Sequence, residues 1–453
     1  MFAVLLNACS DNCSDKLIDI SLSSPAGNSM KVEALVHTAD SMNAWVEYWE
    51  KGRESQIFKT PVSANRKEHK IVITNLQPQQ AYVCRIVTAT NNCESKSRNY
   101  DFKTPAMPVW IHDYFKVICP DSSVVPAAFR DGYMLIYKRE TPGIAFIIDP
   151  KGQIVWYHQV NGTGFKTAHF TNRQSILCIL GNESFQTSYG NQILELSLSG
   201  DTLFNQQTPV VHHEAILNND NNIVTISTEE KILDLSAKGG GKRDTVKSDG
   251  IIVLDRQGKT IWKWTVFDAL DPLSDPQILK DKSDWMHANS LSIDKDGHYL
   301  LSFYNNGQIW KIDSKTGKLI WKFGKGGDFK MPEGSVFDNS HAVHINAKNQ
   351  LMLFDNGTGK QLSQALAFTL DESAKQASLA LQVKLPRDVY SERMGSAYLI
   401  NDTTVLHTCS KRNTVVLTNL SGRFLWAMKT GIMPYRVEFI PAKDLEPFIV
   451  KPK

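Results

Sequence analysis

The stretch Asp255-Arg-Gln-Gly-Lys-Thr-Ile-Trp262 decides the fold, because its pattern returns along the chain. An aspartate opens a turn with a glycine, and a strand-like run follows and ends in tryptophan. Close copies lie at 149–156, 313–321 and 419–426, and weaker ones near 198–204 and 379–385. A spacing of roughly 40–60 residues is that of a four-stranded propeller blade. The copies predict an all-β chain with a six-bladed β-propeller over residues 108–453.

Residues 17–105 carry a different pattern, in which apolar and polar side chains alternate in short runs such as Ala44-Trp-Val-Glu-Tyr-Trp49. Period-2 runs separated by turn residues predict a small antiparallel β-sandwich ahead of the propeller. The run Leu76-Gln-Pro-Gln-Gln-Ala-Tyr82 resembles the L-x-P-x-x-x-Y signature of fibronectin type III domains. Such sandwiches are usually spacers or interaction modules, so this domain says little about function.

Composition narrows the class of protein. The 453 residues are 42% hydrophobic and 21% charged, with a formal net charge of +3. These values are typical of a soluble globular protein and give no reason to expect a nucleic-acid partner. No stretch approaches the ~20 apolar residues that a membrane-spanning helix needs.

The first residues, Met1-Phe-Ala-Val-Leu-Leu-Asn-Ala-Cys9, resemble the end of a bacterial lipoprotein signal. We therefore expect residues 1–16 to be a signal remnant and tether, with Cys9 as the lipidated mature N-terminus. This predicts a protein of the bacterial cell envelope, in the periplasm or at the outer membrane, whose only membrane contact is the lipid.

Seven cysteines are present, and two of them flank a probable hairpin turn at Asn91-Asn92. Cys84 and Cys93 are the best candidates for a disulfide in an oxidising compartment. The pairing of the remaining cysteines stays open: Cys13, Cys119, Cys178 and Cys409.

Histidines recur in three similar contexts, each followed by an apolar run: His212 and His213, then His287, then His341. Propeller ligands bind at one end of the central channel, where residues from several blades converge, so we expect one shared pocket. Residues i and i+2 of a strand share a face, which predicts that His287 and Asn289 point into that pocket together. For the same reason only one of His212 and His213 should enter it.

These motifs resemble those of the bacterial aryl-sulfate sulfotransferase family. Residues 284–290 match its D-W-x-H-x-N-S element, and further likenesses lie at 212–223, 340–342 with 353–357, 395–397 and 434–436. The resemblance implies a six-bladed propeller that transfers sulfate between phenols without a nucleotide sulfate donor and without a cofactor. The implied partners are small phenolic sulfate donors and phenolic acceptors.

The resemblance also implies residue roles. His341 is the expected nucleophile, and His287, His213 (or His212) and Asn289 would hold the sulfuryl oxygens and the bridging phenol oxygen. A neutral imidazole can attack sulfur near neutral pH, and the phenolate leaving group needs a proton donor. The expected kinetics are ping-pong, through a sulfohistidine.

Tyr304 stands where the family usually has an arginine, in a pattern like L-x-S-x-R. Replacing a bidentate cation is not conservative, so Lys360, Arg393 or Arg436 would have to supply the charge, or the substrate differs. Tyr304 and Phe303 are alternatively an aromatic wall for a phenol.

Two other functions remain open. Three histidines could ligate a metal in a propeller hydrolase, although matched carboxylates are missing beside the motifs, and we expect no metal. A non-catalytic propeller that binds a ligand or partner is favoured if the lost arginine was essential. The sequence leaves the oligomeric state open, with a homodimer as one possibility.

Overall fold

The computed structural model describes residues 17–25, 28–90, 93–111, 114–119, 121–445 and 448. The chain divides into two compact units, one mainly of residues 17–111 and one mainly of residues 114–445. Cys9 and Cys13, with the predicted lipid anchor and tether, lie outside the described residues. Within the described ranges, no helix has the length and apolar character needed to cross a bilayer.

The first unit is built around one long strand, β2 (Val32–Glu50). Its first part pairs with β1 (Leu17–Ser23) and β4 (Ser63–Ile73), and its second part pairs with β3 (Phe58–Lys59) and β5 (Ala81–Ala89). β5 also pairs with β6 (Glu94–Lys96) and β7 (Tyr100–Lys103). All of these pairings are antiparallel. Because β2 pairs with different strands along its first and second parts, all seven strands belong to one hydrogen-bonded sheet. They share one hydrophobic core.

The predicted Cys84–Cys93 disulfide is wrong. Cys84 is a free, buried thiol on β5, whereas Cys93 is disulfide-bonded and lies beside Thr90 at the far end of the hairpin. Thr90 comes six positions after Cys84, which is roughly 20 Å of extended chain. A disulfide requires Cα atoms within about 7 Å, so the hairpin register keeps these two cysteines apart.

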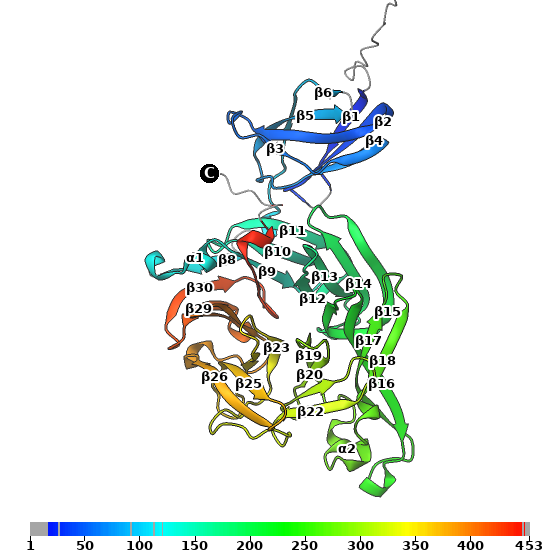
Figure 1. Cartoon of the computed structure of the whole chain (residues 1–453), viewed down its shortest axis with the longest axis vertical. Coiled ribbons are helices and arrows are strands. Elements are labelled where there is room, and N and C mark those ends of the chain that lie inside the picture. Colours follow the sequence, from blue (N-terminus) through cyan, green and yellow to red (C-terminus); the bar gives the residue numbers. More distant parts are fainter. Residues whose placement is uncertain are drawn as a thin grey trace, which may run out of the picture. The chain divides into compact units, whose positions relative to one another are not determined.

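The second unit is all-β, and its described residues contain only short helices, such as α1 (Ala127–Arg130), α2 (Ile278–Asp281) and α3 (Ala442–Leu445). Its sheets follow one another around a common centre in a propeller-like arrangement (Figure 1). The first half holds β8 (Phe115–Ile118), β9 (Tyr133–Lys138), β10 (Gly143–Ile148), β11 (Ile154–Val160), β12 (Gly164–Phe170), β13 (Ser175–Gly181), β14 (Tyr189–Ser197), β15 (Thr202–Leu217), β16 (Ile223–Leu233), β17 (Asp244–Leu254) and β18 (Thr260–Thr265).

The second half continues with three sheets that each start at an inner strand. They comprise β19 (Ala288–Ile293), β20 (Tyr299–Phe303), β21 (Gln308–Ile312) and β22 (Leu319–Gly324); β23 (His341–Ile345), β24 (Leu351–Asp355), β25 (Gln364–Asp371) and β26 (Gln376–Lys384); and β27 (Ser396–Asn401), β28 (Thr404–Cys409), β29 (Thr414–Asn419) and β30 (Phe424–Thr430). β8 adds a fifth strand beside β30.

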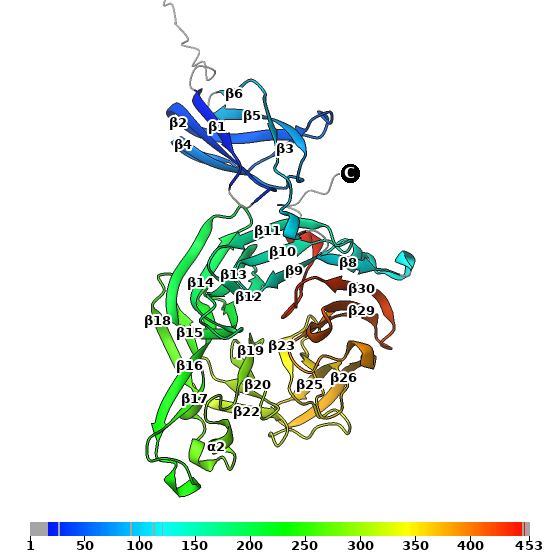
Figure 2. The same ribbon diagram turned by 180° about the vertical axis from the view of Figure 1, so that it is seen from behind.

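Two features join the sheets into one unit. β15 pairs with β14 along its first part and with β16 along its second, so strands β12 to β18 are one seven-stranded sheet (Figure 2). The last strand, β31 (Glu438–Ile440), returns to pair with β9 and completes the sheet β11-β10-β9-β31. The two ends of this unit are therefore held by strand pairing.

The repeated aspartate motif has a local cause. Asp149 Oδ1 accepts hydrogen bonds from the amides of Lys151 and Gln153, both at 2.9 Å. The same side-chain-to-backbone turn recurs at Asp255, Asp313 and Asn419. Each turn includes a glycine with φ between 71° and 83°, a left-handed conformation that glycine adopts without a steric penalty. Each motif thereby marks a hairpin, namely β10–β11, β17–β18, β21–β22 and β29–β30.

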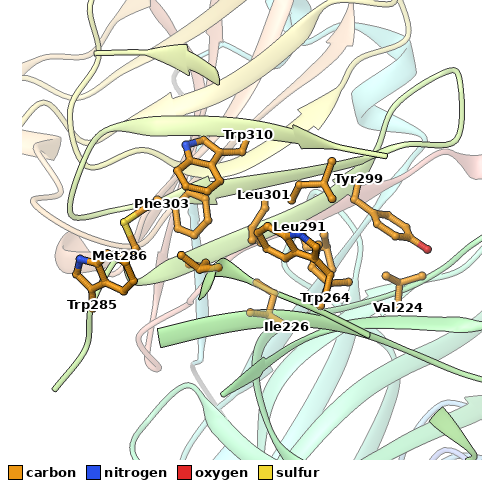
Figure 3. Packing of buried hydrophobic residues seen from close by; sticks show 14 of the residues in the cluster. Val224, Ile226, Trp264, Trp285, Met286, Leu291, Tyr299, Leu301, Phe303 and Trp310 are labelled. Atoms are coloured by element: carbon orange, nitrogen blue, oxygen red, sulfur yellow. The ribbon is translucent and has the colours of Figure 1, made fainter. Parts of the chain in front are cut away.

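Large apolar side chains fill the space between neighbouring sheets. Figure 3 shows one such cluster, in which Phe303 of β20 packs against Trp310 of β21 with ring centroids 4.8 Å apart. Trp264 of β18 and Ile226 of β16 belong to the same cluster, so it joins two sheets. Trp310 is fully buried, and its indole Nε1 donates to Gln308 Oε1 at 2.8 Å.

We expect Trp310→Ala to lower the free energy of unfolding of this unit by about 3–5 kcal/mol, because it leaves a large cavity in the core. Trp310→Phe keeps most of the volume and should cost clearly less. Urea unfolding followed by circular dichroism measures both. Equal stability of wild type and Trp310→Ala would contradict this account of the core.

Candidate functional site

The three histidine motifs meet at one cavity of about 520 Å³ in the second unit. β19 contacts both β15 and β23, which brings the histidine-bearing ends of these inner strands together. Six of the lining residues carry the argument that follows: Arg139, His213, His287, Tyr304, His341 and Tyr435.

A bulge accompanies each histidine. The strand register shifts between His212 and Ala215, between Ala288 and Ser290, and between His341 and His344. Left-handed backbone accompanies each shift, with φ of 59° at His213, 75° and 54° at Met286 and His287, and 52° at Ala342. Such conformations are uncommon for residues with a Cβ, and bulges re-aim side chains next to binding sites. The bulges break the alternation of the strands and let all three imidazoles reach the cavity.

The tautomer of His341 is determined by Asn356 of the Phe-Asp-Asn-Gly stretch. The Asn356 amide nitrogen donates to the carbonyls of Ser391 at 2.6 Å and Met394 at 2.8 Å. Its oxygen therefore faces His341 Nδ1, at 2.7 Å, and accepts a hydrogen bond from the Nδ1 proton. This leaves the lone pair on Nε2. The only partner that the described residues offer this nitrogen is the Met394 amide, at 3.3 Å.

His341 is neutral under ordinary conditions. Burial lowers the pKa of its imidazole to about 3, and the hydrogen bond to Asn356 only partly offsets this effect. A neutral ring with a fixed Nδ1 proton and a lone pair on Nε2 has the state that a histidine nucleophile needs.

His287 has the opposite electrostatics. Its Nδ1 lies 2.6 Å from Asp284 Oδ2. Burial lowers the pKa of His287, but the hydrogen bond and charge of Asp284 outweigh it, so the pKa is raised overall. Because Asp284 engages Nδ1, Nε2 is the nitrogen left to donate a proton to a ligand.

His213 lines the cavity and His212 lies behind it. Their Nδ1 atoms are 2.8 Å apart, and His212 Nε2 lies 3.4 Å from Asp249 Oδ1. Burial lowers the pKa of His212 to about 3 and that of His213 well below its usual range. His213 is therefore the member of the pair that faces the site. His212 does not line the cavity, so the predicted substrate-binding role does not fit its position.

Asn289 and Phe303 lie elsewhere than predicted. Asn289 is fully buried beneath the site, where its amide donates to the Ser340 carbonyl at 2.8 Å. The prediction from i, i+2 spacing fails because β19 begins only at Ala288 and is bulged directly after it. Phe303 is part of the core beside Trp310 and does not line the cavity, so the predicted aryl-binding role does not fit its position (Figure 3). Tyr304, the next residue, does line it.

The three cations considered from the sequence differ in burial and in whether they reach the cavity. Arg436 is buried and pairs with Glu214, and Lys360 is exposed with its ammonium on the Val336 carbonyl. Arg393 lines the cavity as an exposed side chain. A second lining arginine, Arg139, follows β9 directly and is buried. It lies in no recognisable motif, and its place at a strand end was the only sequence signal for it.

The site histidines do not form a compact ligand set. Among the described residues, three possible ligand side chains converge at Asp294, Asp296 and Glu372. Lys311 already fills that place, with its ammonium 2.5–2.7 Å from all three carboxylates. The geometry of the described residues therefore gives no support to a three-histidine metal centre.

Comparison with protein families and structures completes the description. The family model described as Arylsulfotransferase (ASST) matches residues 121–421. Among solved structures, a protein of unknown function from Bacteroides caccae is 12% identical with a TM-score of 0.44, covering 68% of this chain and 98% of its own. Inactive virginiamycin B lyase from Staphylococcus aureus is 8% identical with a TM-score of 0.35, covering 70% and 99%. These likenesses are too low to carry an argument. A search of curated proteins found no match.

Asp284→Asn should lower the pKa of His287, because the charge that offsets burial is removed. Titration of the imidazole signals by NMR measures the shift. The control is Asp313→Asn, which removes a carboxylate 3.8 Å from the half-buried His298, away from the cavity. If the pKa of His287 is the same with and without Asp284, the assignment of its protonated state is wrong.

Proposed function

The chain belongs to the arylsulfotransferase family, and from this premise we propose that it moves a sulfuryl group from a phenolic sulfate ester to a phenolic acceptor through a sulfohistidine on His341. The observation that carries the proposal is the Asn356–His341 hydrogen bond at 2.7 Å, which leaves the lone pair on Nε2, where the Met394 amide at 3.3 Å is the only partner among the described residues. A sulfotransferase activity is consistent with the family; the nucleophile and the order of steps are our proposal.

In the first half-reaction, His341 Nε2 attacks the sulfur of the donor. The N–S bond forms as the S–O bond to the aryl oxygen breaks, and the leaving phenolate takes a proton from His287 Nε2. The Nδ1 proton of the sulfated ring stays hydrogen-bonded to Asn356 Oδ1. Burial suits this step, because a dry site strengthens the interactions that stabilise the developing charge.

The second half-reaction reverses the first. His287, now neutral on Nε2, takes the proton of an acceptor phenol, and the phenol oxygen attacks the sulfur. The S–N bond breaks and neutral His341 is restored. His213 faces the same cavity and is neutral, so one of its ring nitrogens can donate to a sulfuryl oxygen.

Tyr304 supports a second candidate function. Its ring lies edge-on to His287 and His341, at 5.4 and 5.5 Å between centroids, where the family arginine would otherwise reach the site. A propeller that binds an aryl sulfate without turnover would keep this aromatic contact and lose the chemistry. Binding without any transfer, in the assay below, would favour this alternative.

We also propose the finer features of architecture and location. Counting the sheet through β15 as two blades makes six blades in all, and β15 supplies the outer strand of one and the inner strand of the next. The fibronectin-like nature of the first unit and an envelope location through a lipid on Cys9 are proposals that rest on the sequence patterns alone.

His341→Ala should abolish phenol-dependent release of nitrophenol from 4-nitrophenyl sulfate, because the attacking nitrogen is lost. The control is His298→Ala, outside the cavity, which should keep activity. Intact-mass measurement after incubation with donor alone should show one added sulfuryl group in wild type and none in His341→Ala. Undiminished activity of His341→Ala would move the nucleophile elsewhere.

His287→Gln should slow transfer from donors with poor leaving groups by roughly 10²–10⁴, the usual contribution of a general acid. Donors such as 4-nitrophenyl sulfate, whose phenolate leaves without a proton, should be affected much less. In wild type, the rate with a poor leaving group should fall as pH rises through the raised pKa of His287. Equal losses across a series of substituted phenyl sulfates would rule out His287 as the acid.

A further inference from the structure

A transferring sulfuryl group spreads negative charge over its oxygens, and the position of the family arginine offers this site no cation. Tyr304 stands there, and its hydroxyl is directed to the Glu392 carbonyl at 3.4 Å. The neutral His213 and His341 add no positive charge, and the charge of protonated His287 is paired with Asp284, whose Oδ2 lies 2.6 Å from its Nδ1. If the site takes a sulfate ester, another group must supply the charge.

Arg436 cannot supply it. Its guanidinium is committed to Glu214, the Asn289 carbonyl at 2.7 Å and Ser290 Oγ at 3.0 Å, and it does not line the cavity. Arg393 reaches the cavity as an exposed side chain, so water screens its charge.

Arg139 is the buried cation of the cavity, only 4% exposed. Its Nε donates to the Thr187 carbonyl at 3.1 Å and its Nη2 to Ser188 Oγ at 2.5 Å, and the guanidinium lies 4.5 Å from the centre of the Tyr435 ring. All of these partners are uncharged. The exposed Glu140, which also lines the cavity, acts on Arg139 through its charge, but within the described ranges no carboxylate forms an ion pair with Arg139. A buried charge without a counter-ion is costly, and a bound anion would offset that cost.

The guanidinium is placed beside the proposed nucleophile. Arg139 Nη1 lies 3.1 Å from the sulfur of Met394, a weak acceptor, while the Met394 amide lies 3.3 Å from His341 Nε2. One residue, Met394, thus contacts both the guanidinium and the attacking nitrogen. The backbone there is closely packed: a Cβ on Gly164 would lie 1.9 Å from the Arg139 carbonyl oxygen, so only glycine fits against it.

We propose that Arg139 is the anion-binding residue of this site and holds the sulfuryl oxygens in place of the arginine that Tyr304 replaces. The inference rests on the proposed function for the identity of the anion. The ligand class is a sulfate monoester. It would be bound by the planar fork of a guanidinium that follows β9, rather than by a residue at the position of Tyr304 after β20.

The test is calorimetric titration of the full chain with inorganic sulfate, which needs no turnover. Arg139→Met should weaken sulfate binding by at least about tenfold, the usual loss of a charged hydrogen bond. Arg393→Met is the matched control, since it removes the other arginine of the same cavity, and it should bind within about threefold of wild type. Sulfate binding by Arg139→Met equal to wild type, or no sulfate binding by wild type, overturns the inference.

A second variant distinguishes loss of the anion site from a folding defect in Arg139→Met. Arg139→Lys keeps the charge and loses the fork, so sulfate affinity should fall several-fold while the melting temperature is unchanged; unchanged affinity in this variant also overturns the inference. The double variant Arg139→Met, Tyr304→Arg should regain sulfate binding. If the wild type binds sulfate through Arg139 but has no transferase activity, the proposed function is refuted. The assignment of the anion site to Arg139 is then still supported.

Discussion

The arrangement of the site depends on a buried ionic contact between Arg436 and Glu214. Arg436 precedes the closing strand β31, Glu214 belongs to β15, and Arg436 also holds the Asn289 carbonyl of β19. One guanidinium therefore joins the segment before β31 to β15, which carries His213, and to β19, which directly follows His287. Breaking one partner of a buried pair leaves the other charge uncompensated, at a cost of about 3–5 kcal/mol.

The same contact extends into a small network of charges. Glu214 also meets the imidazole of His169 on β12, and His169 Nδ1 lies 3.2 Å from Glu438 of β31. Burial alone would lower the pKa of His169, but the two carboxylates raise it to about 10, so it is a cation beside Arg436. Two cations and two carboxylates thus balance one another where the inner strands converge. The neutral histidines of the cavity lie against a rigid support rather than on mobile loops.

Local patterns made much of the fold predictable. The aspartate turns depend on hydrogen bonds within five residues, so the hairpins at Asp149 and Asp255 can be predicted from the sequence alone. The meeting of the three histidines was predicted from their three similar contexts in the repeated units. Asn289 was misplaced because a bulge breaks the strand period on which the argument relied, and Phe303 because it packs against Trp310 in the core. Arg139 and Asn356 escaped notice because their roles come from residues far along the chain, near 187–188 and 391–394.

The left-handed residues around the cavity also bear on how this protein can change. Conformations of this kind cost about 1–3 kcal/mol each, and a glycine would relieve the cost. Selection for heat resistance could accept glycine at Ala342, whose methyl group the proposed chemistry does not use. Glycine at His213 or His287 would relieve the same backbone strain, but it would remove an imidazole that the proposed chemistry uses. A stabilising glycine at His213 or His287 would therefore cost activity. A more heat-stable form of the protein would have to gain its stability elsewhere in the propeller-like unit.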